Sequence, residues 1–279
     1  MSRMGLPYAY VIAEIGGNHG GSLEVAKQMI RIAALSGAAM VKFQKRDVEK
    51  SRHVWEKIPR RDAHAYGENE YLHRKALEFS PDQHLELKKA CVEAGVAYGC
   101  SAWDQASYDF LASLDLPWIK VPSAKNEEWP TWTLGPTPLH VSLGMLDEKG
   151  KERVLQNAHG RPWVTPYACT SKYPSEAHET YLGEVALLRT QFPRVGFSGH
   201  HKGIALDIGA YLLGAEYIER HFTLDRTAKG TDHAASLEPD GLRKLCRDLD
   251  GIKEAYKTKP AALPECERGP WTKFKGGGR

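Results

Sequence analysis

Eight short apolar runs restrict the fold of this chain more than any other feature of its sequence. Continuous apolar runs of this kind are typical of parallel strands that are buried on both faces. Helical patterns lie between most of them, and the clearest begins at Ser22 as N-cap and ends at Gly37. The predicted strands cover residues 10–15, 39–43, 96–100, 118–121, 139–143, 163–167, 195–197 and 217–219, and the other predicted helices cover residues 81–94, 105–113, 179–191, 204–213 and 239–256.

Strands that alternate with helices along one chain of 279 residues predict a single α/β domain. We expect a (β/α)8 TIM barrel over residues 1–258, because such barrels commonly occupy about 250 residues. A doubly wound open sheet shows the same alternation and remains the alternative. The connection after the fourth strand, NEEWPTWTLGP, has room for at most one short helix.

Two segments depart from this alternation. Residues 46–79 form a long loop after the second strand, which should fold over the mouth of the barrel and is either functional or contains short elements of its own. Residues 259–279 lack apolar periodicity, so we predict an irregular C-terminal tail. Its last, glycine-rich residues are expected to be disordered or not native.

Composition argues against several classes of protein. The net charge is only +3, and the basic residues are scattered, so nucleic acid is not an expected partner. Five cysteines without a CxxC pair fit free thiols in a reducing compartment. No apolar run approaches the roughly 18 residues that span a bilayer. We therefore expect a cytoplasmic protein with no membrane contact.

Two histidines at strand ends are candidates for metal binding. His200 follows the seventh predicted strand and His221 follows the eighth, and the carboxyl ends of barrel strands meet at one mouth. Two neutral imidazoles without a thiolate suit an open catalytic site for Mn, Mg or Zn. The alternative is that each histidine only forms hydrogen bonds within the core. His201 is a third candidate, but neighbouring side chains at a strand end tend to diverge.

Lysines and hydroxyls at strand ends predict a site for an anion. Lys42 and Lys120 lie among apolar strand residues, where an uncompensated charge is costly. They either hold a phosphate or carboxylate, or form internal ion pairs with Glu14 or Glu219, and the sequence leaves both open. Hydroxyls at strand ends would suit a phosphorylated carboxylic acid; they belong to Ser101, Ser123, Ser142 and Ser198.

Two carboxylates are further candidates. Glu14 closes the first predicted strand, and Asp232 follows the eighth in the segment KGTDHAASLEP. Either carboxylate could orient a hydroxylated substrate or transfer a proton. The alternative is that they only neutralise a barrel lysine. In the same segment, Ser236 and Pro239 more plausibly mark the start of a helix.

Taken together, these motifs resemble the sialic acid synthase (N-acetylneuraminate synthase) family. The collinear match runs from Ile12 to about Leu249 and includes IAEIGGNHGGSLEVAKQMI, VKFQK, YGENEYLHRKALEFS, CSAWD, IKVPSA, VSLGM, CTSKYP, FSGHH and ERHFTLD. The family condenses phosphoenolpyruvate with the open-chain aldehyde of an N-acetylmannosamine-type sugar and releases phosphate. The resemblance therefore implies a transferase that forms a sialic acid-like 2-keto-3-deoxy sugar acid, and by analogy a homodimer.

The resemblance also implies roles for individual residues. His200 and His221 would bind the divalent metal, Mn²⁺ in preference to Mg²⁺, and together with Glu14 they would form the catalytic group. Glu14, Tyr173 and Asp232 would face the sugar. The phosphoenolpyruvate site would be lined by Lys42, Ser101, Lys120, Ser123, Ser142, Ser171 and Ser198.

Several residues depart from the family pattern, and these departures bear on which sugar the chain would recognise. Leu143 stands where Ser or Thr is usual, Pro122 and Ala124 stand where glycines are usual, and Lys172 adds a cation near the sugar side. The chain ends about where family members continue into a small antifreeze-like domain that contacts the sugar. We predict an acceptor other than plain N-acetylmannosamine, such as a more anionic aldose. A metal-dependent aldolase that uses pyruvate and a catalytically inactive binding barrel remain the alternatives.

Overall fold

The computed structural model describes residues 6–276, and its eight parallel strands form a closed barrel. Strand order follows the sequence, and β1 pairs with both β2 and β8, which closes the ring. This closure confirms the predicted TIM barrel over the open sheet. The strands are β1 (Tyr10–Glu14), β2 (Met40–Lys45), β3 (Ala97–Ala102), β4 (Ile119–Val121), β5 (Leu139–Ser142), β6 (Val164–Cys169), β7 (Gly196–Gly199) and β8 (Tyr217–His221).

Helices surround the barrel and begin at recognisable signals. Ser22 caps α1, Ser80 forms a capping box with Gln83 at the start of α4, and Pro239 occupies the first turn of α9. The helices are α1 (Leu23–Leu35), α2 (Arg52–Trp55), α3 (Glu70–Leu77), α4 (Pro81–Ala94), α5 (Gln105–Ala112), α6 (Glu148–Ala158), α7 (Gly183–Gln191), α8 (Ala205–Leu212), α9 (Pro239–Ala255) and α10 (Glu265–Phe274), with short 3-10 turns η1 (Ser123–Lys125), η2 (Trp129–Thr131), η3 (Ala177–Glu179) and η4 (His233–Ala235).

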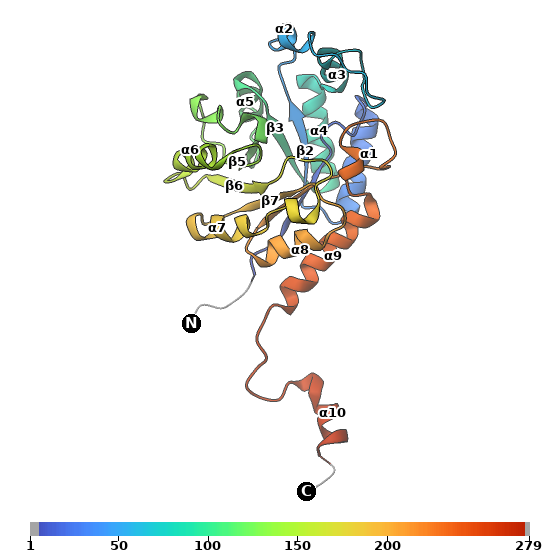
Figure 1. Cartoon of the computed structure of the whole chain (residues 1–279). Helices are drawn as coiled ribbons and strands as arrows, with labels where there is room; N and C mark the ends of the chain where they lie inside the picture. Colours follow the sequence, from blue (N-terminus) through green and yellow to red (C-terminus); the bar gives the residue numbers. More distant parts are fainter. Residues whose placement is uncertain (1–5, 277–279) are drawn as a thin grey trace.

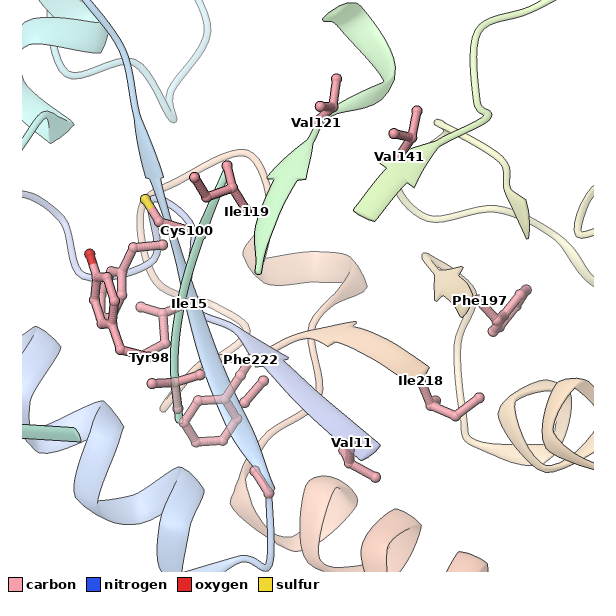
Figure 2. Packing of buried hydrophobic residues seen from close by; sticks show 14 of the residues in the cluster. Val11, Ile15, Tyr98, Cys100, Ile119, Val121, Val141, Phe197, Ile218 and Phe222 are labelled. Atoms are coloured by element: carbon pink, nitrogen blue, oxygen red, sulfur yellow. The ribbon is translucent and has the colours of Figure 1, made fainter. Parts of the chain in front are cut away.

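Two apolar clusters stabilise the barrel, one on each side of its wall. Side chains alternate across a strand, so Val11 belongs to the cluster between the strands and the helices, whereas Ile12 belongs to the cluster inside the barrel. Figure 2 shows side chains of the outer cluster, including Val11, Phe197 and Ile218. The inner cluster closes the amino-terminal end of the barrel and consists of Ile12, Met40, Trp118, Tyr167 and Tyr217.

The long loop, the connection after β4 and the C-terminal tail can be compared with their predicted structures. The long loop after β2 contains α2 and α3, and the connection after β4 contains only η1 and η2. The irregular tail was a wrong prediction for residues 265–274, because α10 forms there. No residue of α10 is buried and the helix stands away from the barrel in Figure 1, so it lacks the buried apolar face that the helices packed on the barrel have. The prediction for the last, glycine-rich residues falls mainly on residues 277–279, outside the described residues.

Across residues 6–276, no helix combines the length and the apolar character that crossing a membrane requires.

Candidate active site

A cavity of about 90 Å³ opens at the carboxyl ends of the barrel strands. Ser171 lines a neighbouring cavity, and Asp232 lines another beside His221. The central cavity brings together the other residues predicted from strand ends, which are Glu14, Lys42, Ser101, Lys120, Ser123, Ser142, Tyr173, Ser198, His200 and His221.

The two barrel lysines form internal ion pairs and also line the cavity. Lys42 Nζ lies 2.6 Å from Glu14 Oε2 and donates to Ser101 Oγ at 2.8 Å. Lys120 Nζ lies 3.1 Å from Glu219 Oε2. The internal pairing that the sequence left open is therefore present in the structure. It does not exclude anion binding, because both ammonium groups remain in the wall of the cavity.

In these ion pairs, burial and the charge of the partner shift the pKa of each side chain in opposite directions. Burial raises the pKa of Glu14 to about 7, although Lys42 lowers it. For Glu219, burial is outweighed by Lys120 and Lys42, which lower its pKa to about 2. Burial lowers the pKa of Lys120 despite the attraction of Glu219. An anion in the cavity would compensate this lysine further and stabilise its charge.

Serine hydroxyls in the cavity form hydrogen bonds with Lys120, with Glu219 and with one another. Ser198 Oγ accepts from Lys120 Nζ at 3.1 Å and donates to Glu219 Oε1 at 3.2 Å. Ser123 Oγ donates to Ser142 Oγ at 3.0 Å. Gly144 keeps this region open, because a Cβ at that position would overlap the hydroxyls of Ser123 and Ser171. The hydroxyls therefore converge on one region that suits the oxygens of a phosphate or carboxylate.

The two candidate metal ligands come from neighbouring strands. His200 follows β7 and His221 ends β8, and their ring centroids are 5.6 Å apart. Tyr173 lies over both rings, with centroid separations of 4.0 Å to His200 and 5.6 Å to His221. His201 points elsewhere, as expected, because it is buried against Arg220 and Asp207.

The nitrogen atoms of this pair fit a divalent cation. His200 Nδ1 donates to the Thr170 carbonyl oxygen at 2.7 Å, which leaves Nε2 as the other ring nitrogen; burial lowers the pKa of His200, but the interaction with the Cys169 side chain outweighs burial and raises it. His221 Nδ1 is buried without a hydrogen-bond partner among the described residues. Burial lowers the pKa of His221 to about 4, so its ring is neutral, as a metal ligand must be.

The cation site would be open. No group of three or more His, Cys, Asp or Glu side chains in the described part of the chain is placed to hold a metal. If a cation bound to the two histidines alone, coordination positions would remain for water and substrate. Asp232 Oδ2, 3.8 Å from His221 Nδ1, is close enough to orient this ring or a ligand beside it.

Several residues of the cavity were missed by the sequence analysis, among them Gln44, Trp103 and Cys169. Gln44 Nε2 donates to Glu14 Oε1 at 2.9 Å, Trp103 forms part of the wall, and Cys169 Sγ lies 3.7 Å from Ser123 Oγ. Lys172, predicted as a cation near the sugar side, is exposed, pairs with Glu179 at 2.5 Å and is not among the residues that line the central cavity.

Fold and site together define a class of protein, a (β/α)8 barrel whose mouth holds two buried lysines beside a histidine pair. The profile of the NeuB family matches residues 29–260. The N-acetylneuraminate-9-phosphate synthase of Drosophila melanogaster is 39% identical over 88% of this chain and 68% of that protein. The human enzyme of the same name is 38% identical over 92% of this chain and 74% of its own length. The chain therefore belongs to the NeuB family.

Solved structures agree with this assignment. The N-acetylneuraminic acid synthetase of Leptospira borgpetersenii, crystallised with citrate, superposes with a TM-score of 0.77 at 25% sequence identity. The match covers 96% of this chain and 93% of that chain. Another relative by sequence, the N,N'-diacetyllegionaminic acid synthase of Campylobacter jejuni, is 34% identical over 89% of this chain and 80% of its own length. All of these relatives are named for the synthesis of sugar acids.

Proposed function

We propose that this chain condenses phosphoenolpyruvate with the open-chain aldehyde of an N-acetylmannosamine-like aldose. The products are a sialic acid-like 2-keto-3-deoxy sugar acid and inorganic phosphate. The observation that carries the proposal is the convergence of Lys42, Lys120 and several serine hydroxyls on one cavity beside His200 and His221. Membership of a family of sugar acid synthases supports it.

The lysines and serines bind and orient phosphoenolpyruvate. Its phosphate and carboxylate carry the charges that Lys42 and Lys120 compensate, and Ser101 and Ser198 extend the set of hydrogen-bond donors. Ser123, Ser142 and Ser171 complete this side of the site. Because these groups are fixed by the strands, they need little reorganisation as charge moves during the reaction.

The acceptor aldose lies on the histidine side. Glu14 is held by Lys42 and Gln44, which places its carboxyl group to bind a sugar hydroxyl or to transfer a proton. Tyr173 and Asp232 border the same region. A divalent cation, Mn²⁺ in preference to Mg²⁺, held by His200 and His221 would act as a Lewis acid on the aldehyde.

The reaction balances with these groups. C3 of phosphoenolpyruvate attacks the aldehyde carbon, a carbon–carbon bond forms, and the aldehyde oxygen takes a proton. Water then adds to C2 and loses one proton, which balances the proton taken up by the aldehyde oxygen. The C2–O bond to phosphate breaks as the ketone forms, and the proton of the C2 hydroxyl leaves with the phosphate. The buried lysines stabilise the departing phosphate.

The proposal is tested by incubating the chain with Mn²⁺, phosphoenolpyruvate and a panel of aldoses. We expect inorganic phosphate and a 2-keto-3-deoxy sugar acid in equal amounts, measured by phosphate release and mass spectrometry. We further propose an acceptor more anionic than plain N-acetylmannosamine, so rapid turnover of N-acetylmannosamine alone would contradict that part. A pyruvate-dependent aldolase would form product from pyruvate without liberating phosphate.

Metal content separates this function from that of an inactive binding barrel. We expect about one Mn²⁺ per chain after incubation and gel filtration, and a loss of both metal and phosphate release in His221→Ala. His178→Ala, which changes an exposed histidine far from β8 in sequence, is the control. If metal and activity survive in His221→Ala, the proposed ligand pair is wrong.

We also propose a cytoplasmic location and a homodimer. All five cysteines are unpaired, which is consistent with a reducing compartment. The dimer rests on analogy with the family, and gel filtration with light scattering tests it.

A further inference from the structure

A separate cavity of about 360 Å³ opens at the amino-terminal end of the barrel, opposite the active site. Its lining residues lie near the starts of the barrel strands, and we call it the amino-terminal cavity. Its volume falls within the range of about 300–1,000 Å³ that is typical of small-molecule sites. The aromatic part of the lining consists of Tyr10, Trp118, His140, Trp163 and Tyr217.

His140 is a buried polar group at this end of the barrel. Only 3% of the residue is exposed, and its Nδ1 lies 2.7 Å from the Tyr167 hydroxyl. Among the described residues, no hydrogen bond reaches its other ring nitrogen, Nε2. Burial, and then the charge of Lys120, lower the pKa of His140 well below its usual value, so the ring is neutral. A neutral imidazole in an apolar layer is costly unless both nitrogens have partners, so a ligand that reaches Nε2 would be favoured.

Aromatic rings form rigid walls around the cavity. The His140 ring stacks on Trp118, with centroids 4.4 Å apart and planes 3° apart, and it meets Tyr217 edge to face at 4.5 Å. Tyr217 stacks in turn on Tyr10 at 5.2 Å. Each ring is therefore held in place by its neighbours. Flat, fixed walls favour a planar aromatic ligand, which packs against ring faces and edges and loses little freedom on binding.

The rim of the cavity adds a positive charge. Arg194 precedes β7, and its side chain is 64% exposed. Its carboxylate partner Glu216 lies 3.9 Å from Nε, which is too far for a hydrogen bond, and is not among the residues that line the cavity. A guanidinium in this position suits a carboxylate, which it can bind through two parallel hydrogen bonds.

We propose that the amino-terminal cavity binds a small planar aromatic carboxylate. The aromatic ring packs between Trp163, His140 and Tyr217, and the carboxylate reaches Arg194 at the rim. A polar atom on the ring that reaches His140 Nε2 would add a hydrogen bond. No residue lines both this cavity and the central one, so the two sites are distinct. Binding at this end of the barrel goes beyond the proposed synthase function and does not depend on it.

Three probes separate the contribution of the ring from that of the charge. 2-Naphthoate has a planar ring system and a carboxylate, 2-naphthalenemethanol has the ring system without the charge, and octanoate has the charge without a ring. Isothermal titration calorimetry of the full chain, with and without excess phosphoenolpyruvate, measures the dissociation constants. We expect 2-naphthoate to bind at one site per chain under both conditions. The other two probes should bind about ten-fold more weakly or worse.

Variants of the lining locate the site. Arg194→Gln should weaken 2-naphthoate about ten-fold and leave 2-naphthalenemethanol unchanged, because it removes only the charged contact. Trp163→Leu removes one ring of the wall and should weaken both naphthyl probes, and circular dichroism checks that this variant folds. Arg52→Gln is the control, since it removes an exposed arginine of α2, in the loop that follows the carboxyl end of β2.

Several results would overturn this inference. Equal affinity for 2-naphthoate in Arg194→Gln and in the unaltered chain would show that the arginine does not hold the carboxylate. Octanoate that binds as tightly as 2-naphthoate would assign the cavity to an aliphatic acid. Loss of 2-naphthoate binding in excess phosphoenolpyruvate would place the probe in the central cavity, and failure of all three probes to bind would mean that the amino-terminal cavity is not a ligand site.

Discussion

Lys120 is held by a tyrosine ring as well as by a carboxylate. Its Nζ lies 3.3 Å from the centre of the Tyr167 ring, and the Tyr167 hydroxyl lies 2.7 Å from His140 Nδ1. Gly196 on β7 makes room for the ring, because a Cβ there would overlap it. The ring is therefore fixed beneath the ammonium group and attracts it through its face.

Replacing Tyr167 should weaken phosphoenolpyruvate binding more than catalysis. Tyr167→Leu removes the ring face and should raise the KM for phosphoenolpyruvate about ten-fold, the equivalent of about 1.4 kcal/mol, with a smaller change in kcat. Tyr167→Phe keeps the face and should stay close to the unaltered chain. Steady-state kinetics at saturating aldose measure both values, and equal KM values in the two variants would show that the ring face is not what positions Lys120.

At the residue scale, the sequence predicted where side chains lie in the fold better than it predicted which groups they pair with. Residues at strand ends could be assigned to one mouth because the fold brings all carboxyl ends together. Gln44 was missed although it lies two residues after Lys42, on the same face of the strand. The ion pair of Lys120 with Glu219 could only be left open, because it joins β4 to β8 and depends on the geometry across the barrel.

At the scale of elements, buried segments were predicted well and exposed ones poorly. Each predicted strand overlaps an observed strand, because a barrel strand is apolar on both faces. Helix α6 was not predicted: its sequence EKGKERVLQNA is mostly polar, and only a few of its residues are buried. Helices α2 and α3 could not be specified either, since the long loop that contains them is rich in charge and lacks a long apolar stripe.

The long loop is anchored to the turn before α1 by a close backbone contact. Gly21 has φ +82°, and a Cβ at this position would overlap the carbonyl oxygen of Ala76 in α3. Only glycine can adopt this conformation and leave that space open. The contact fixes α3, and with it Arg74, over the mouth of the barrel.

Gly21→Ala should destabilise the chain more than a matched glycine change. Gly95→Ala also places alanine at a positive φ, +75°, but meets no atom within 4 Å, so it should cost about 1 kcal/mol. Gly21→Ala adds overpacking and should cost about 1–3 kcal/mol beyond that value. Urea unfolding followed by circular dichroism gives both free energies of unfolding. If both variants lost the same free energy of unfolding, α3 would be able to move aside without an energetic cost.

On the scale of the whole molecule, buried neutral histidines make folding sensitive to acid. Burial is the main cause that lowers the pKa of His84 from 6.5 to about 3 and that of His19 to about 4. His140 is shifted well below its usual value for the same reason. The folded state therefore resists protonation at sites that the unfolded chain protonates readily near pH 6.5.

The free energy of unfolding should fall as the pH is lowered below 6.5. Each such histidine contributes stability that is fully present above its unfolded pKa and that decreases by about 1.4 kcal/mol per pH unit toward its folded pKa. His84→Gln should lower the slope between pH 6 and 4 by about one proton, because it removes one such group. Urea unfolding over this range measures the slope, with the exposed His53→Gln as control; an unchanged slope in His84→Gln would contradict the assignment.

Closure of the ring by β8 also bears on the order of events during synthesis of the chain. The carboxylate that neutralises Lys120 and one of the two imidazoles both arrive on this last strand, long after the ribosome has made β2 and β4. Until that strand docks beside β1, a nascent chain carries an ammonium group in its interior without its counter-ion. The site can therefore fold only after nearly the full barrel has left the ribosomal exit tunnel. Fragments that lack β8 should be degraded by proteases.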